Sequence, residues 1–223
     1  PEPIRLFQTR AKRFTFLSES NELAPYLGFL AGLSRLQARL AATLPPVTPV
    51  TPASESHAMP PIDRMALADD PGLAATLKAL TEGATELDMP PPARLALDAV
   101  RAATDEDRNW LLSNILADRI PLDSAAPHLF AAAAVQVHLA RLAATLDVDT
   151  LVPVGVGVCP ACGGRPVTSS VMGAQGIENV RYATCACCAT QWNEVRVKCL
   201  CCGSTKGISY RSVETTEATV KAE

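Results

Sequence analysis

The chain has 223 residues, which is long enough for one large domain or two smaller ones. Its content of 48% apolar and 19% charged residues is typical of a folded protein and excludes a disordered one. The net charge of -3 and the lack of any run of Lys or Arg argue against nucleic-acid binding. No stretch is long and apolar enough to span a bilayer, and no secretory signal opens the chain, so we expect no membrane insertion.

The first 150 residues predict an all-α bundle of about six helices. Residues 4–17 form a first short helix, and a longer one runs from Asn21, as its N-cap, to Leu44. Apolar residues recur in this second segment at steps of three and four, which indicates an amphipathic helix. The Pro-rich residues 45–63 then predict a surface loop.

Four further helices follow in the same pattern. Asp70 and Pro71 supply an N-cap and first-turn pair for a helix that ends near Gly83. A helix over residues 93–103 comes next, and Thr104 begins another, with an acidic first turn and an apolar face predicted to consist of Trp110, Leu111, Ile115 and Leu116. Asp123 or Ser124 begins the last and most apolar helix, to about Leu146, in which we expect His128 and His138 to be buried core residues rather than ligands.

The pattern changes after Asp149, so we place a domain boundary near residue 150. Residues 1–150 are then the helical bundle domain, and residues 151–223 a cysteine-knuckle metal-binding region. Valine alternates with Pro or Gly from Val152 to Val158, which predicts a strand leading into this region. Further short β-type runs cover residues 166–172, 194–197 and 208–213. The fold class is therefore α+β and multidomain, with a rubredoxin-like or zinc-ribbon-like C-terminal part.

Cysteine placement is the most informative feature of the sequence. All eight cysteines lie between Cys159 and Cys202. A secreted disulfide scaffold would spread its cysteines through the fold. Tight pairs confined to one segment are typical of thiolate metal ligands in a reducing compartment, so we expect a cytoplasmic protein.

Six of these cysteines form three CxxC knuckles: Cys159 and Cys162, Cys185 and Cys188, and Cys199 and Cys202. Two cysteines three residues apart can direct both sulfurs at one ion, and the glycines after the first and third pairs permit the tight turn. Four thiolates from two knuckles suit zinc or a single iron. The 22 residues between the first two pairs leave room for a hairpin.

Three knuckles supply one and a half four-ligand sites. Either Cys187 and Cys201 provide the missing ligands, or a fourth knuckle lies beyond Glu223; we expect the second, which makes residues 151–223 an incomplete region. A closed site of four cysteines has no open coordination position, so its expected role is structural, and we assign no catalytic residue. A thioredoxin-type redox pair is disfavoured because it would begin a helix within a βαβ unit.

The C-terminal sequence resembles the formate dehydrogenase accessory (formation) protein family, FdhE. The resemblance lies in Cys159-Pro-Ala-Cys-Gly-Gly-Arg-Pro-Val167, in Arg181-Tyr182, and in the second and third knuckles with the Thr190-Gln-Trp192 and Val195-Arg-Val-Lys-Cys199 runs between them. Val220-Lys-Ala-Glu223 is similar to the run before the family's fourth CxxC pair. A looser similarity covers residues 6–14 and 21–29.

The resemblance implies a cytoplasmic, non-enzymatic maturation factor, a chaperone-like protein for respiratory formate dehydrogenases. It implies binding to the catalytic subunit, as the precursor that bears a twin-arginine signal, and two rubredoxin-like sites that hold iron or zinc. Cys159, Cys162, Cys185 and Cys188 would form the first site, and Cys199 and Cys202 would begin the second. Weak self-association stays open. Two alternatives remain: a thiol-based redox or sulfur-transfer enzyme that uses Cys187 or Cys201, and a nucleic-acid-binding zinc ribbon.

Overall fold

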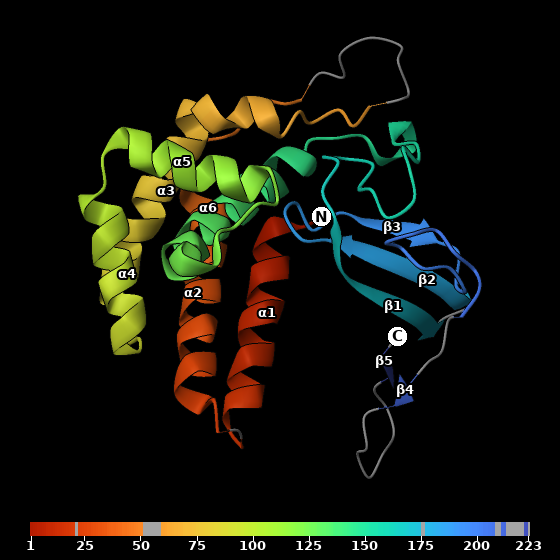
Figure 1. Cartoon of the computed structure of the whole chain (residues 1–223), viewed down its shortest axis with the longest axis horizontal. Coiled ribbons are helices and arrows are strands. Elements are labelled where there is room, and N and C mark those ends of the chain that lie inside the picture. The colour runs from red at the N-terminus through yellow and green to blue at the C-terminus, as the bar shows by residue number, and fades with distance from the viewer. Residues whose placement is uncertain (21, 51–58, 175–176, 208–210, 213–220, 223) are drawn as a thin grey trace.

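The computed structural model describes residues 1–20, 22–50, 59–174, 177–207, 211–212 and 221–222. Figure 1 shows the helices gathered on one side of the molecule and a small antiparallel sheet on the other, with the N-terminus between them. The predicted class, a helical N-terminal part followed by a small cysteine-bearing β region, is confirmed. The domain boundary near residue 150 stays a prediction.

Helices α1 (Pro3–Ser18) and α2 (Ala24–Thr43) lie side by side as a pair. Helix α2 buries the apolar positions that predicted it, among them Leu33, Leu36 and Leu40. It begins two residues later than expected, with Leu23 at its N-cap and a proline in its first turn, and the predicted cap Asn21 lies outside the described residues.

Helices α3 (Pro71–Gly83) and α5 (Asp105–Leu116) begin where their capping residues predicted. The carboxylate of Asp70 accepts a hydrogen bond from the Leu73 amide at 2.8 Å, and the Thr104 hydroxyl accepts one from the Asp107 amide at 3.1 Å. Each bond satisfies an amide that has no partner within its own helix. Helix α4 (Pro91–Ala102) comes between them in the sequence and begins with prolines, which are tolerated in a first turn.

The predicted apolar face of α5 is wrong at one position. Trp110 is 49% exposed, with the edge of its ring near His128, whereas Leu111, Leu112, Ile115 and Leu116 are buried. At 100° per residue, position 110 lies on nearly the opposite side of the helix from position 112.

Helix α6 (Ala125–Ala143) occupies the centre of the helical part and contacts each of α1 to α5. Its many alanines let neighbouring helices approach, and Phe130 and Leu139 are fully buried among them. His128 and His138 are also buried, as expected of core histidines. Ser124 precedes the helix but makes no side-chain cap. No helix among the described residues combines the length and apolar character needed to cross a bilayer.

The sheet consists of β1 (Pro166–Ala174), β2 (Ile177–Cys185) and β3 (Gln191–Glu194), antiparallel and in that order. Strands β1 and β2 form the hairpin predicted between the first and second knuckles. A separate two-residue pair joins β4 (Arg211–Ser212) to β5 (Lys221–Ala222).

Two strand predictions are wrong. Residues 152–158 form no strand, because Pro153 has no amide hydrogen to donate and Gly157 has a left-handed φ of 63°. The last strand of the sheet ends at Glu194 instead of running from Glu194 to Val197. Most of the run predicted over residues 208–213 lies outside the described residues.

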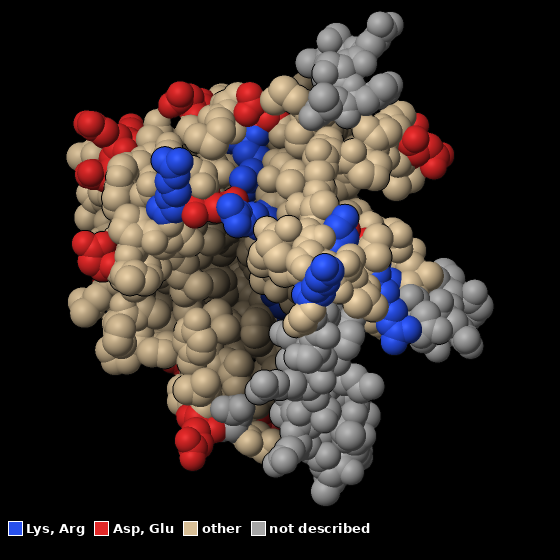
Figure 2. Space-filling view, turned by 45° about the vertical axis from the view of Figure 1, so that its right-hand side comes forward, with Lys and Arg blue, Asp and Glu red and all other residues tan. Residues whose placement is uncertain are grey.

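Charged side chains of both signs are interspersed on the molecular surface. Residues 151–223, the cysteine-bearing β region, are called the ribbon below. Figure 2 shows single Lys and Arg side chains separated by uncharged or acidic residues on the face that carries the ribbon. A continuous basic stripe, the usual footprint of a nucleic-acid-binding domain, is not seen on this face among the described residues.

Candidate metal centre

The three cysteine knuckles share one backbone geometry. In each, the amide of the first cysteine donates to the carbonyl five residues further on. These bonds join Cys159 to Gly164 at 2.9 Å, Cys185 to Thr190 at 3.0 Å and Cys199 to Ser204 at 2.9 Å. The CxxC spacing therefore produces the same turn three times, as local sequence predicts.

The residue after the second cysteine is left-handed in every knuckle. Gly163 and Gly203 have φ values of 71° and 73°, as predicted for glycine at this position. Ala189 takes the same place in the second knuckle with a φ of 58°. A side chain raises the energy of this conformation, so the second knuckle holds its turn against a local cost.

The first two knuckles bring four sulfurs together. Sγ of Cys159 lies 3.6 Å from that of Cys188, and Sγ of Cys162 lies 3.6 Å from Cys185 and 3.5 Å from Cys188. All four lie within 4.8 Å of one another, and the residues are 0–2% exposed. A tetrahedral zinc ion with Zn–S bonds of about 2.3 Å would place its sulfurs about 3.8 Å apart. The cluster therefore has the donor set and size for one tetrahedral ion.

Hydrogen bonds divide protons unequally among these thiols. Bonds with the Cys159 and Cys162 thiols lower the pKa of Cys185 to about 4, whereas bonds with Cys159 and Cys185 raise the pKa of Cys162. The backbone amide of Cys187 also donates to Cys185 Sγ at 3.4 Å. A proton held on one sulfur thus stabilises a thiolate on the next, and a divalent cation can take the place of these protons.

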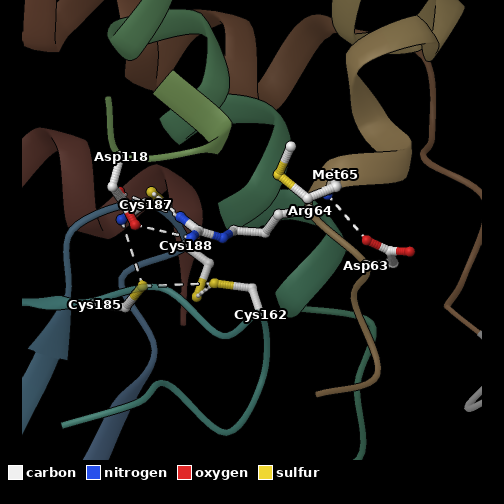
Figure 3. Close-up of polar contacts among 8 residues, drawn as sticks. All are labelled: Asp63, Arg64, Met65, Asp118, Cys162, Cys185, Cys187 and Cys188. Atoms are coloured by element: carbon white, nitrogen blue, oxygen red, sulfur yellow. Dashed lines mark hydrogen bonds and ion pairs between the residues drawn. The ribbon is translucent and has the colours of Figure 1, made fainter. Parts of the chain in front are cut away.

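Arg64 approaches the cluster from the helical part of the chain (Figure 3). Its guanidinium binds both carboxylate oxygens of Asp118, at 2.9 and 3.4 Å, and Nη1 lies 3.4 Å from Cys187 Sγ. The Arg64 side chain is 12% exposed. A cation is therefore held next to the four-sulfur cluster with little access to water.

Gly164 leaves the space in which the cation and the sulfurs meet. A Cβ at this position would lie 2.9 Å from Cys185 Sγ and 3.4 Å from both Cys162 Sγ and Arg64 Nη1. The first of these distances is too short for a real carbon atom, so only glycine fits without a shift of the cluster.

Backbone contacts hold both knuckles of the cluster against the helical part. The amide of Ile62 donates to the carbonyl of Ala161 at 3.0 Å, and the Gln136 side chain of α6 donates to the carbonyl of Ala186 at 3.2 Å. Arg10 of α1 in turn donates to Gln136 Oε1 at 2.7 Å. Ile62 is 4% exposed, so the prediction of a surface loop over residues 45–63 is wrong at this point.

The third knuckle lies apart from the other two. Within the described part of the chain, Cys199 and Cys202 do not join a further group of metal-ligating side chains. Cys199 is partly exposed, and Cys201 and Cys202 are exposed. All three line an open pocket of about 590 Å³ together with residues of β1 and with Arg181. The ligand roles predicted for Cys199 and Cys202 remain predictions.

Sequence reasoning found the four converging cysteines but missed the residues around them. Arg64 and Asp118 are 54 positions apart and carry no motif. Thr190, whose Oγ1 lies 3.1 Å from Cys188 Sγ, resembles any strand threonine. The sequence held one signal of a close approach to the cluster. Two glycines follow Cys162, and the turn itself needs only the first.

Comparisons with known proteins point to one family. The family described as "FdhE, N-terminal" matches residues 1–156, and "FdhE, central domain" matches residues 158–196. A protein FdhE homolog from Rhizobium meliloti (strain 1021) is 54% identical over 230 residues, covering 100% of this chain and 75% of that protein. A protein FdhE homolog from Pseudomonas putida is 34% identical, covering 94% of this chain and 67% of that protein.

A solved structure has the same fold. The crystal structure of the FdhE protein from Pseudomonas aeruginosa matches with a TM-score of 0.81 at 30% identity, covering 95% of this chain and 74% of that one. Two family domains that together span residues 1–156 and 158–196, a 54% identical relative and this shared fold establish that the chain belongs to the FdhE family.

Proposed function

We propose that this chain is a cytoplasmic, non-enzymatic accessory protein for a respiratory formate dehydrogenase. It binds the catalytic subunit as the precursor that bears a twin-arginine signal, before export, and that subunit needs it to become active. Membership of the FdhE family supports the class of client. The proposed partner is a folded or folding protein; neither nucleic acid nor a membrane is one.

One observation carries the non-enzymatic part of this proposal, namely the closed cluster of Cys159, Cys162, Cys185 and Cys188. Four buried thiols leave no coordination position for a substrate, so an iron or zinc ion bound there has a structural role. The ion would fix both knuckles and, through Ala161 and Ala186, the chain segments of the helical part that contact them.

The surroundings of Cys187 do not favour a redox or sulfur-transfer enzyme. Cys187 is buried, and its hydrogen bond with Cys185 together with its burial raises its pKa, which opposes formation of a nucleophilic thiolate. Cys201 is exposed in the third knuckle, so it is the thiol at which the enzyme alternative would be tested, by selective alkylation. The interspersed charges of the surface in Figure 2 likewise do not favour a nucleic-acid-binding ribbon.

Co-purification with the precursor of the formate dehydrogenase catalytic subunit tests the proposal. Full-length protein would be compared with a Cys159→Ser/Cys162→Ser double variant and with Cys201→Ser as a matched control, and bound metal would be measured by elemental analysis. We expect wild type and Cys201→Ser to retain both client and metal, and the double variant to lose both. Retention of the client by the double variant would move the binding surface to the helical part, and no retention by any protein would refute the accessory function.

A further inference from the structure

We propose that Arg64 is a positioning residue of the four-cysteine site, whose guanidinium, oriented by Asp118, offsets the negative charge of the thiolates and strengthens binding of a divalent metal ion. The inference rests on the proposed metal site at Cys159, Cys162, Cys185 and Cys188. It assigns to a residue of the helical part a role in a site whose ligands all belong to the ribbon.

The charge of the site favours such a partner. Four thiolates around one divalent cation carry a net charge of about -2. The four cysteines are 0–2% exposed, so water solvates this charge poorly and an uncompensated site would be costly. The Cys187 amide supplies one hydrogen bond to a ligand sulfur, but an amide is only a dipole.

The position of Arg64 suits this task. A Cβ on Gly164 would touch Arg64 Nη1, Cys162 Sγ and Cys185 Sγ at once, so the guanidinium and two ligand sulfurs border the same small space. Nη1 also lies 3.4 Å from the sulfur of Cys187, one of the two residues between the ligands of the second knuckle. Because the arginine is 12% exposed, its attraction to the thiolates is weakly screened by solvent.

Asp118 orients the guanidinium without cancelling its effect. The carboxylate follows α5 at a residue with a left-handed φ of 53°, and it binds the two terminal nitrogens of Arg64 at once. Its side chain is 30% exposed, against 12% for Arg64, so its own charge is the better screened of the two. Burial alone would lower the pKa of Arg64, but the hydrogen bond with Asp118 and the charge of that carboxylate raise it, so the guanidinium stays charged.

The planar fork of arginine suits both of these contacts at once. One guanidinium can bind a carboxylate with two nitrogens and direct one of them at a sulfur, whereas the ammonium of lysine supplies charge without this fixed geometry. Arg64→Lys therefore keeps the counter-charge and loses the orientation. Arg64→Gln loses the charge while keeping a side chain that can donate hydrogen bonds.

Cobalt(II) titration of the full chain tests the inference, with affinity measured by competition with a chelator and thiolate coordination by the sulfur-to-cobalt absorption bands. Arg165→Gln is the matched control, since Arg165 follows the first knuckle, that of Cys159 and Cys162, but its side chain is exposed. We expect Arg64→Gln to weaken Co²⁺ binding about 10-fold or more, as is typical of residues that support metal ligands. Arg64→Lys should recover most of that loss, Asp118→Asn should fall between wild type and Arg64→Gln, and Arg165→Gln should bind as wild type does.

Several outcomes would overturn the inference. Unchanged affinity in Arg64→Gln would remove any role in metal binding. An equal loss in Arg64→Gln and Arg64→Lys would mean that Arg64 only packs the interface, and an equal loss in Arg165→Gln would mean that net charge alone matters. If Arg64→Gln does not fold, as judged by circular dichroism, the Co²⁺ affinities of Arg64→Lys and Asp118→Asn, compared with that of wild type, decide whether the inference stands. Absence of the thiolate bands in wild type would instead refute the metal site itself.

Discussion

The helical part buries hydrocarbon, whereas the cysteine ribbon buries sulfur. In the helices, fully buried side chains such as Phe130, Leu97 and Leu139 form a continuous apolar core around α6. Among the ribbon residues whose side chains the structure describes, those exposed by 2% or less are Cys159, Ala161, Cys162, Ala183, Cys185 and Cys188. A three-stranded sheet of this size buries little apolar area of its own, although its cysteines and Trp192 continue the helical core, so we expect a bound ion to supply much of its stability.

The largest effect should come from removing one ligand of the ribbon. Cys162→Ser should lose bound iron or zinc and unfold the ribbon, because in such a small region the free energy of metal binding is free energy of folding. Elemental analysis and thermal unfolding measure both effects. Cys202→Ser in the third knuckle is the control and should leave the metal at the first site in place. Full metal content and an unchanged Tm in Cys162→Ser would refute the ligand assignment.

The next largest effect is expected in the helical core. Phe130→Ala should lower the free energy of unfolding by about 3–5 kcal/mol, because it removes a fully buried ring and leaves a cavity. Denaturant unfolding with and without a chelator should give the same decrease, and metal content should not change. Loss of metal in this variant would show that the two regions are stabilised as one unit.

A smaller effect should follow from filling the space beside the cluster. Gly164→Ala places a carbon 2.9 Å from Cys185 Sγ, so the overpacked site should lose about 1–3 kcal/mol of stability and bind metal more weakly. Gly155→Ala is the matched control, since its Cβ would meet only Val158, at an ordinary 3.4 Å. Chelator competition on both variants compares them, and equal metal affinity would contradict the close approach at Gly164.

The helical part should also respond to acid on its own. Burial lowers the pKa of His138, although Asp70, 3.5 Å away, opposes this shift. The Nδ1 atom of His138 is buried and has no hydrogen-bond partner. Because the unfolded chain binds this proton at a higher pH than the folded one, stability is complete above the ordinary histidine pKa of about 6.5 and falls as the pH drops below it, by about 1.4 kcal/mol for each unit of pKa difference. Denaturant unfolding from pH 7.5 to 5.5 should show a flatter dependence in His138→Gln; an equal slope in both proteins would contradict the assignment.

The smallest effect concerns the one knuckle that lacks a glycine. Ala189→Gly should relieve the left-handed alanine and stabilise the metal-loaded protein by at most about 1 kcal/mol, a gain that removal of the buried methyl group partly offsets. Gly163→Ala at the equivalent position should act in the opposite direction. A pair of Tm measurements suffices, and a shift of the same sign in both variants would refute the shared geometry.

Local chemistry made part of this structure predictable. Asp70 and Thr104 fixed the starts of α3 and α5 because a capping side chain bonds within three residues. The knuckles were recognisable because two cysteines at CxxC spacing need only the turn between them. The hairpin between Cys162 and Cys185 followed from the length of the gap.

The features that sequence did not predict depend on distant contacts. Arg64 meets Cys187 across 123 positions, and its segment lies in a Pro-rich stretch without periodicity. Trp110 was assigned to a buried face by its apolar character, although the helix period turns it outward. The alternating valines of residues 152–158 suggested a strand, but pairing depends on amide hydrogens and backbone angles that Pro153 and Gly157 do not supply.

The β1–β2 hairpin has a consequence for the order of events when the protein folds. Pairing of Pro166 with Cys185 places the first knuckle beside the second through the backbone alone. Closing a loop costs entropy that grows only with the logarithm of its length, and β-hairpins form in about 1–10 μs. The metal-free hairpin is too small to persist alone, but each time it forms it brings the four thiols together, and an arriving ion stabilises that arrangement.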